Sequence, residues 1–166
     1  MSFNENTRVK IPAILHLCRL GYKYLSLKNY VKDLNTNIFM DIFDESIKRI
    51  NSDKTDIDTK KIFEDISLCL DNDDLGKEFY KKLTAVSGIK LIDFNNFNNN
   101  SFNVVTELEY ENDEDIFRPD ITILINGMPL AFIEVKKPNN HEGILAERDR
   151  INIRFKNKKF KKFINI

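Results

Sequence analysis

The sequence has no tryptophan, and its two cysteines, Cys18 and Cys69, are far apart in the chain. Each cysteine falls in an apolar helical pattern, so we expect two small buried side chains and neither a disulfide nor a metal pair. Sparing use of cysteine is typical of proteins of the reducing cytoplasm. The longest apolar runs, ITILI and PLAFI, are far shorter than the ~20 residues of a membrane-spanning helix, and no signal peptide is predicted.

Glycine is also rare, with five residues. No Gly-x-x-x-x-Gly-Lys-Ser/Thr loop occurs among them, so these residues predict no ATP site. Charge is plentiful and balanced, with 26 Lys+Arg and 26 Asp+Glu, but residues 136–166 hold ten basic and three acidic residues. A basic segment on an acidic body predicts an anionic partner, although a solvated lysine-rich face would have the same composition.

The spacing of apolar residues divides the chain into a helical first part and a strand-rich second part. Apolar residues at helical spacing predict helices at about residues 7–20, 36–50, 59–70 and 74–86. In the last of these helices the expected buried stripe is Leu75, Phe79, Leu83 and Val86. Three β-rich runs follow, and they read FNVVTELEY, DITILI and LAFIEV.

A final helix is expected at about residues 142–156, and the closing apolar-basic run is expected to begin another strand. This order predicts a single α/β domain over residues 1–166, in which a small mixed sheet is flanked by helices. Its helical part would cover about residues 1–88, and the sheet with the functional core would cover about residues 89–166.

The stretch RPDITILINGMPLAFIEVKK reads as a β-hairpin, because Asn126-Gly127 between two apolar runs is a strong turn signal. Glu134 and Lys136 are two residues apart on the second strand, so their side chains share one face. Asp120 enters from the neighbouring strand. These three charged residues are either an active site or an ordinary hairpin surface.

The register of the hairpin decides whether the two acids meet. A three-residue loop pairs Ile125 with Pro129 and places Asp120 opposite Glu134. A two-residue turn instead places Asp120 opposite Ile133, with the two acids on different faces. Proline donates no backbone hydrogen bond, so its position favours the longer, bulged loop.

Opposed carboxylates need a compensating charge. Directly opposed residues have Cβ atoms about 4.5–5.5 Å apart, so Asp120 and Glu134 would repel each other in an apolar hairpin. Two carboxylates with water and a substrate phosphate suit Mg²⁺, which can polarise a phosphodiester. Lys136 could stabilise the developing negative charge or position the attacking water. The alternative is a surface hairpin on which Lys136 merely neutralises Glu134.

The residues around this pattern resemble a known family. RPDITILINGMPLAFIEVKKPN is similar to the nuclease core of the R subunits of type I restriction enzymes (HsdR), which have the PD-(D/E)XK nuclease fold. NENTRVKIPAILHLCRLGY, GIKLIDFNNFNNNSFNVVTELEY and GILAERDRINIRFKNKKFKKFINI also resemble these subunits. The resemblance therefore covers nearly the whole chain.

Carried over residue by residue, the resemblance implies that Asp120 and Glu134 hold a metal ion, Mg²⁺, and that Lys136 is the catalytic lysine. The backbone carbonyl of Val135 is a further metal ligand in this interpretation. Many relatives also use an acid from the first helix. Glu5 stands at that place, although the helix dipole explains an acid there equally well.

The chain departs from the family pattern after the lysine. Many R subunits carry Gln-x-x-x-Tyr on the next helix, but this sequence has no glutamine. Its helix instead reads AERDRINIRFK, with Arg150, Arg154 and Lys158 four apart and Arg148 nearby. We expect the arginines to contact DNA phosphates. A solvated helix face, with Glu147 and Asp149 as local partners, is the alternative.

Three functions remain open from the sequence. The first is a metal-dependent DNA endonuclease module of an R subunit, truncated from a longer motor-containing chain and without sequence readout of its own. Its partners would be double-stranded DNA, the ATP-driven helicase motor of the parent chain, and the modification and specificity subunits. The second is a non-catalytic assembly or DNA-tethering domain that retains the nuclease fold. The third is a free-standing nuclease.

Overall fold

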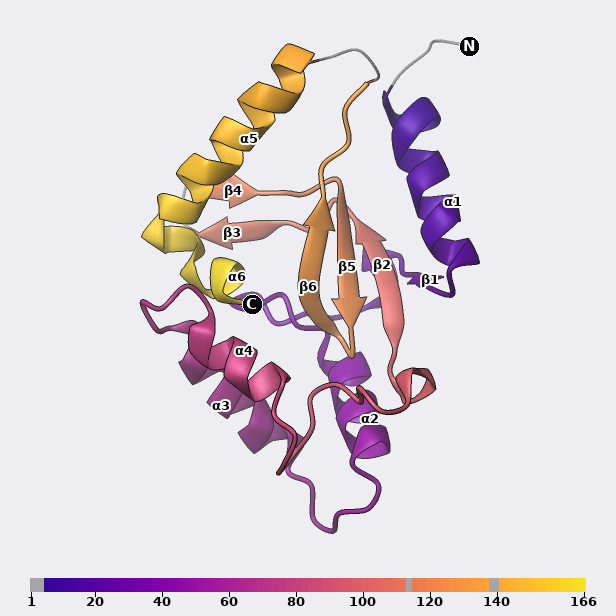
Figure 1. Ribbon diagram of the computed structural model, residues 1–166, viewed down its shortest axis with the longest axis vertical. Helices are drawn as coiled ribbons and strands as arrows, with labels where there is room; N and C mark the ends of the chain where they lie inside the picture. Colours follow the sequence, from indigo (N-terminus) through magenta and orange to yellow (C-terminus); the bar gives the residue numbers. More distant parts are fainter. Residues whose placement is uncertain (1–4, 113–114, 138–140) are drawn as a thin grey trace.

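A computed structural model describes residues 5–112, 115–137 and 141–166 (Figure 1). The helices are a short π-helical turn Asn6–Lys10 followed by α1 (Ile11–Arg19), α2 (Met40–Ile50), α3 (Thr59–Leu70), α4 (Lys77–Leu83), α5 (His141–Lys156) and α6 (Lys161–Asn165). The strands are β1 (Lys23–Tyr24), β2 (Phe102–Thr106), β3 (Tyr110–Asn112), β4 (Asp115–Phe117), β5 (Ile121–Ile125) and β6 (Met128–Ile133).

The main sheet has four strands in the order β1-β2-β5-β6. β1 runs parallel to β2, whereas β2, β5 and β6 are antiparallel to their neighbours, so the sheet is mixed. A separate two-stranded hairpin, β3-β4, lies to one side (Figure 1). The expected mixed α/β architecture with a helical N-terminal half is confirmed, and it is consistent with a nuclease-like fold.

Helices cover the sheet at both ends. α1 packs on β2 and β5 through a small apolar cluster formed by Leu17, Val104, Ile121 and Val135. A larger core joins α2, α3 and α4 to the turn end of the hairpin, where Met128 is fully buried. In Figure 1, α1 and α5 therefore flank one end of β5 and β6, and α2, α3 and α4 lie at the other.

The β5-β6 turn is docked onto the start of α2. The backbone N–H of Phe39 donates to the carbonyl of Gly127 at 2.9 Å. Asn126 is fully buried, and its side chain bonds the carbonyl of Leu91 and the side chain of Asn100. Gly127 has φ +80°, and a Cβ there would lie 2.7 Å from the Phe39 carbonyl. Only glycine fits this combination of conformation and close approach.

Several expectations about individual residues were wrong. In the stripe of α4, Phe79 is buried, but Leu75 and Val86 are 79% and 95% exposed because α4 spans only Lys77–Leu83. The closing run forms the short helix α6 and not a strand. Its aromatic residue Phe163 packs edge-on against Phe117 of β4, with ring centroids 4.9 Å apart. This aromatic cluster stabilises the helical conformation through tertiary contacts.

The cysteines do not pair with each other. Cys18 and Cys69 are free and only partly buried, so they are less buried than we expected. No helix among the described residues is long and apolar enough to cross a membrane.

Candidate active site

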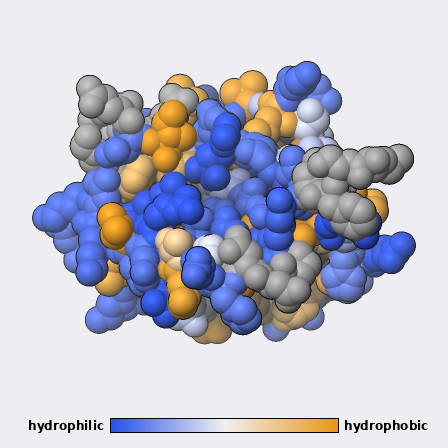
Figure 2. All heavy atoms as spheres, turned by 90° about the horizontal axis from the view of Figure 1, so that it is seen from above, coloured by the Kyte–Doolittle hydropathy of each residue, from blue (hydrophilic) through white to orange (hydrophobic). Residues whose placement is uncertain are grey.

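The charged residues of the hairpin gather at the end of β5 and β6 that lies between α1 and α5 (Figure 1). Asp120 directly precedes β5, and Glu134 directly follows β6. Figure 2 looks down on this end of the molecule and shows hydrophilic residues across the middle of the face, with hydrophobic ones scattered around them. The surface at this end of the molecule is therefore mainly polar (Figure 2).

The turn has two residues, so the predicted three-residue loop was wrong. Ile125 pairs with Met128, and Asn126 and Gly127 both have positive φ, as a tight hairpin turn requires. The register then shifts between Ile123 and Leu124.

This register shift is a bulge on β6. Leu124 pairs with Pro129 but Ile123 pairs with Ala131, so Leu130 is the extra residue. A bulge moves the following residues by one position, and beyond it Ile121 pairs with Ile133. Continuing that register brings Asp120 opposite Glu134. The expected pairing of the acids is therefore reached by a different route.

Asp120 and Glu134 lie close enough for each carboxyl group to shift the pKa of the other. Burial raises the pKa of Glu134 to about 7, and the neighbouring Asp120 adds to the effect. The charge of Glu147 raises the same pKa, whereas Lys136 lowers it. Burial also opposes ionisation of Asp120, but hydrogen bonds from the backbone of Val135 and from Lys10 outweigh it and lower the pKa.

Lys10, at the start of α1, is a member of the site that the sequence analysis missed. Its side chain is only 8% exposed, and its ammonium lies 3.2 Å from Oδ1 of Asp120 and contacts Oε1 of Glu107. Burial alone would lower the pKa of Lys10, but its two acidic partners raise it. The first helix therefore supplies a cation to the acids of the sheet.

Glu107 stands where β2 ends, and its backbone has φ +56°, which is unusual for a residue other than glycine. Its Oε1 atom contacts Lys10, and its Oε2 atom accepts from Nε of Arg118 at 3.1 Å. Arg118 also binds Glu109 at 3.0 Å. Arg118 thus holds the loop that follows β2 through ion pairs with two of its acidic residues.

The segment that follows β6 is bonded to two acids, Asp120 and Glu5. The Val135 side chain is buried, and its backbone N–H donates to Oδ2 of Asp120 at 3.0 Å. Two residues further on, the N–H of Lys137 donates to a carboxylate oxygen of Glu5 at 3.1 Å. The acid of the first helical turn therefore contacts the same segment as Asp120.

Lys136 is held by an acid of α5. Its ammonium lies 3.2 Å from Oε2 of Glu147, and the guanidinium of Arg150 lies 3.2 Å from the same oxygen atom. The Lys136 side chain is 21% exposed, and that of Glu147 is 8% exposed. The sequence analysis treated Glu147 only as a local partner on a solvated helix face, so this contact with the hairpin was missed.

The other basic residues of α5 have different surroundings. Arg148 is 65% exposed and pairs with Asp149, whereas Arg154 stacks on the ring of Phe117 at 4.6 Å. Lys158 lies beyond α5 and is 86% exposed. Of the three arginines named as DNA contacts, Arg148 and Arg150 are the exposed ones.

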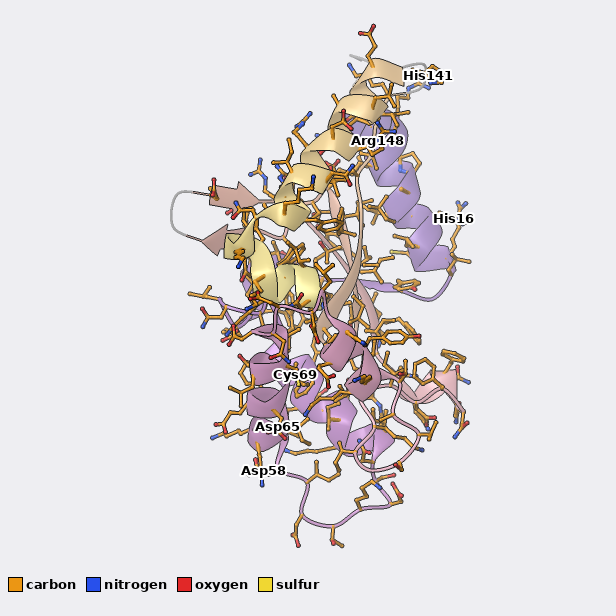
Figure 3. All side chains as sticks on the ribbon, turned by 60° about the vertical axis from the view of Figure 1, so that its left-hand side comes forward. His16, Asp58, Asp65, Cys69, His141 and Arg148 are labelled. Carbon is orange, nitrogen blue, oxygen red and sulfur yellow. The ribbon has the colours of Figure 1, made fainter. Side chains whose placement is uncertain are left out.

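Figure 3 places other reactive side chains away from this site. His16 points outward from α1, His141 stands at the start of α5, and Cys69 lies in α3 together with Asp65. None of these labelled residues joins the acids of the hairpin.

Comparison with known proteins agrees with the geometry. The family model of the type I restriction enzyme R protein N terminus matches residues 2–164. The chain belongs to this family. The resemblance found in the hairpin motif is thereby confirmed over nearly the whole length.

Two relatives from Methanocaldococcus jannaschii illustrate the similarity. One is named "Putative type I restriction enzyme MjaIXP endonuclease subunit" and is 32% identical over 167 residues, which cover 84% of this chain and 16% of that protein. A second, the corresponding MjaVIIP protein, is 40% identical over 73 residues, covering 42% of this chain and 7% of that protein. The chain thus spans about one sixth, or less, of the relatives' length.

Proposed function

We propose that this chain is the metal-dependent DNA endonuclease module of a type I restriction R subunit, a type I site-specific deoxyribonuclease that hydrolyses phosphodiester bonds. The observation that supports it best is the geometry of the strand ends: the register of β5 and β6 leads Asp120 to Glu134, with Lys136 two residues further on, and the intervening N–H of Val135 donates to Oδ2 of Asp120 at 3.0 Å. A shared face for these three residues is the geometric requirement of the proposed chemistry.

The residues present fit a hard divalent cation. Asp120 and Glu134 would hold Mg²⁺ together with the backbone carbonyl of Val135, since oxygen ligands suit this ion. The raised pKa of Glu134, which burial and the neighbouring Asp120 cause, marks a pair of acids that lacks a full counter-charge. Among the described residues no cluster of three or more His, Cys, Asp or Glu side chains is arranged to hold a metal, so water and a substrate phosphate would complete the coordination. When bound, the ion would polarise the phosphodiester and acidify a water molecule.

Lys136 is the proposed catalytic lysine. It extends from the same strand end as Glu134, and its positive charge already lowers the pKa of that neighbour. An ammonium group here can stabilise the negative charge that develops on the phosphate or orient the attacking water.

DNA would approach along α5. Arg148 and Arg150 extend into solvent from this helix, and Arg154 lies further along it against Phe117. Contacts of arginine with phosphate oxygens position a protein on DNA without reading its sequence. We therefore assign no sequence recognition to this module.

The partners in this proposal are double-stranded DNA, the ATP-driven helicase motor of the same parent chain, and the modification and specificity subunits of a restriction complex in the cytoplasm. The module would be residues 1–166 of that longer chain. The low share of each relative that this chain covers agrees with such an arrangement.

The decisive experiment replaces the lysine. Lys136→Ala in the complete restriction complex should abolish DNA cutting while ATP-driven translocation continues at the wild-type rate. Cutting would be followed by loss of supercoiled plasmid, and translocation by displacement of a labelled third strand. Cutting at the wild-type rate by this variant would refute the assignment.

A non-catalytic assembly or DNA-tethering domain is the alternative function. One observation favours it: both carboxylate oxygens of Asp120 already bind protein groups, Lys10 and the N–H of Val135. Titration with Mn²⁺ separates the two functions. A nuclease should bind the ion at millimolar concentration or below, and Asp120→Ala should lose the signal. An unresponsive wild-type protein would favour the assembly domain.

A further inference from the structure

In α5 a charged side chain is buried while several apolar side chains are exposed, which is the reverse of the usual pattern for a helix. All residues of this helix are described, and its one buried side chain belongs to Glu147, whereas apolar residues of the same helix are exposed. The exposed apolar residues are Ile144, Leu145, Ile153 and Phe155. Glutamate is almost never buried unless it is paired. The position of Glu147 is therefore explained by what its carboxylate binds and not by the packing of an apolar face.

The carboxylate of Glu147 binds two cations through one oxygen atom. Lys136 reaches Oε2 from the hairpin, and Arg150 reaches the same Oε2 from one turn along α5. Arg150 is 60% exposed, so this guanidinium also faces the solvent side of the helix. Glu147 thus joins the strand end that carries Glu134 to the helix that carries the exposed arginines.

A lysine at the end of a strand has a long flexible side chain with many conformations. Its ammonium is useful in catalysis only when it is held close to the reacting phosphate, because a displacement of about 1 Å can cost about 100-fold in rate. Among the described residues, Glu147 is the one for which an ion pair with Lys136 is seen. The carboxylate fixes the direction of the ammonium from outside the Asp120–Glu134 pair.

We propose that Glu147 is a positioning residue that holds Lys136 in its working conformation, with Arg150 as the second cation on the same carboxylate. The inference rests on the proposed function and adds to it a residue outside the hairpin. It predicts that the rate of the chemical step depends on a charge in α5 that touches neither the metal ligands nor the reacting phosphate.

The test uses the complete restriction complex with Glu147→Gln, which keeps the size of the side chain and removes its charge. The rate constant of DNA cutting at saturating DNA should fall by about 10- to 100-fold. DNA affinity and translocation should stay within about twofold of wild type, and Mn²⁺ binding should be retained with only a modest change in affinity, because Glu147 acts on Glu134 through its charge alone. Glu147→Asp keeps the charge on a shorter side chain and should restore part of the rate.

Asp149→Asn is the matched control, because Asp149 is an exposed acid of the same helix that also pairs with an arginine. It should cut at the wild-type rate. In a Lys136→Ala background, Glu147→Gln should cause no further loss of any residual activity, because the two residues act through one ammonium.

Two outcomes overturn the inference. Wild-type cutting by Glu147→Gln would show that Lys136 needs no anchor, and loss of Mn²⁺ affinity would show that Glu147 holds the metal itself. If Glu147→Gln does not fold, as judged by its melting curve, the uncharged Glu147→Ala takes its place, and a wild-type rate for that variant refutes the inference. Failure of the nuclease assignment is recognised separately, because Lys136→Ala would then still cut.

Discussion

The ammonium of Lys10 lies 3.2 Å from Oδ1 of Asp120, although 110 residues separate them in the sequence. The same ammonium contacts Glu107, so one buried cation joins α1 to the ends of β2 and β5. The acids at the end of the sheet are therefore neutralised in part by the protein itself.

Replacing Lys10 with methionine should destabilise the fold, because Asp120 and Glu107 would lose a shared buried cation. Removing one partner of a buried ion pair typically costs about 3–5 kcal/mol, and we expect about 3 kcal/mol here because Glu107 is half exposed. Urea unfolding followed by circular dichroism measures the change. Lys48→Met, which breaks an exposed pair with Asp44, is the control and should cost less than about 1 kcal/mol. Equal losses for the two variants would contradict a structural role for Lys10.

Gly127→Ala should lower the free energy of unfolding more than Gly88→Ala. Both glycines have φ close to +80°, so both substitutions suffer the same backbone strain. A Cβ at Gly88 meets no atom within 4 Å, whereas one at Gly127 would meet the backbone of Phe39 and Phe43 below 3 Å. We expect an additional cost of about 1–3 kcal/mol at Gly127. Thermal unfolding of the two variants side by side gives the difference, and an equal loss would show that the turn is not tightly docked.

The stability of the metal-free protein should fall as the pH rises from about 5 to 8. The folded protein raises the pKa of Glu134 to about 7, above its value in the unfolded chain. A raised pKa means that the folded state holds the proton more tightly, so this contribution is present at low pH and is lost as the pH passes 7. Because the pair is partly solvated, we expect a loss on the order of 1 kcal/mol. The lowered pKa of Asp120 acts in the opposite direction but only at more acidic pH.

Glu134→Gln tests this dependence, because it removes the group that titrates. The slope of unfolding free energy against pH should flatten between pH 5 and 8 in this variant. Adding Mg²⁺ should offset the loss at pH 8 in the wild-type protein and leave the variant almost unchanged. A wild-type slope in Glu134→Gln would assign the dependence to another group.

The arginines of α5 should differ in whether their replacement affects the stability of the protein. Arg148→Ala should weaken DNA binding without changing stability, and the slope of log affinity against log salt should fall by about 1. Arg154→Ala should also lower the melting temperature, because its guanidinium stacks on Phe117. Fluorescence anisotropy at several salt concentrations, together with thermal unfolding, measures both effects. An unchanged affinity in Arg148→Ala would exclude this face of α5 from DNA binding.

The hairpin shows how far the sequence could predict the site. Strand alternation placed Glu134 and Lys136 on one face, but the position of Asp120 depended on the register, and the bulge at Leu130 could not be separated from a longer loop by counting residues. Both arrangements shift the register by one position, and so the predicted pairing of Asp120 with Glu134 held although the predicted turn did not. The Asn126-Gly127 turn signal, taken alone, indicated the correct turn length.

Lys10, Glu107 and Glu147 could not be predicted in the same way. Lys10 and Glu107 are ordinary charged residues at a helix or strand end, and their contact joins distant parts of the chain. Glu147 lies inside α5, and its contact with Lys136 depends on how that helix packs against the hairpin. The burial of Glu147 runs against the apolar pattern of α5, so periodicity directs attention to the wrong residues of that helix. Only packing of the helices around the sheet determines which charges meet.

The docked turn at Asn126-Gly127 has a consequence for the whole molecule. A strand rises about 3.3 Å per residue, so the five residues of β5 form an extended segment about 17 Å long between the turn and Asp120. At the turn, this strand is held by the start of α2, a helix that carries no residue of the proposed chemistry. A tilt of α2 against the sheet would therefore move Asp120 relative to its neighbours at the other end of β5. The contact between the turn and α2 thus contributes to the alignment of the proposed active site, although it lies at the opposite end of the strand.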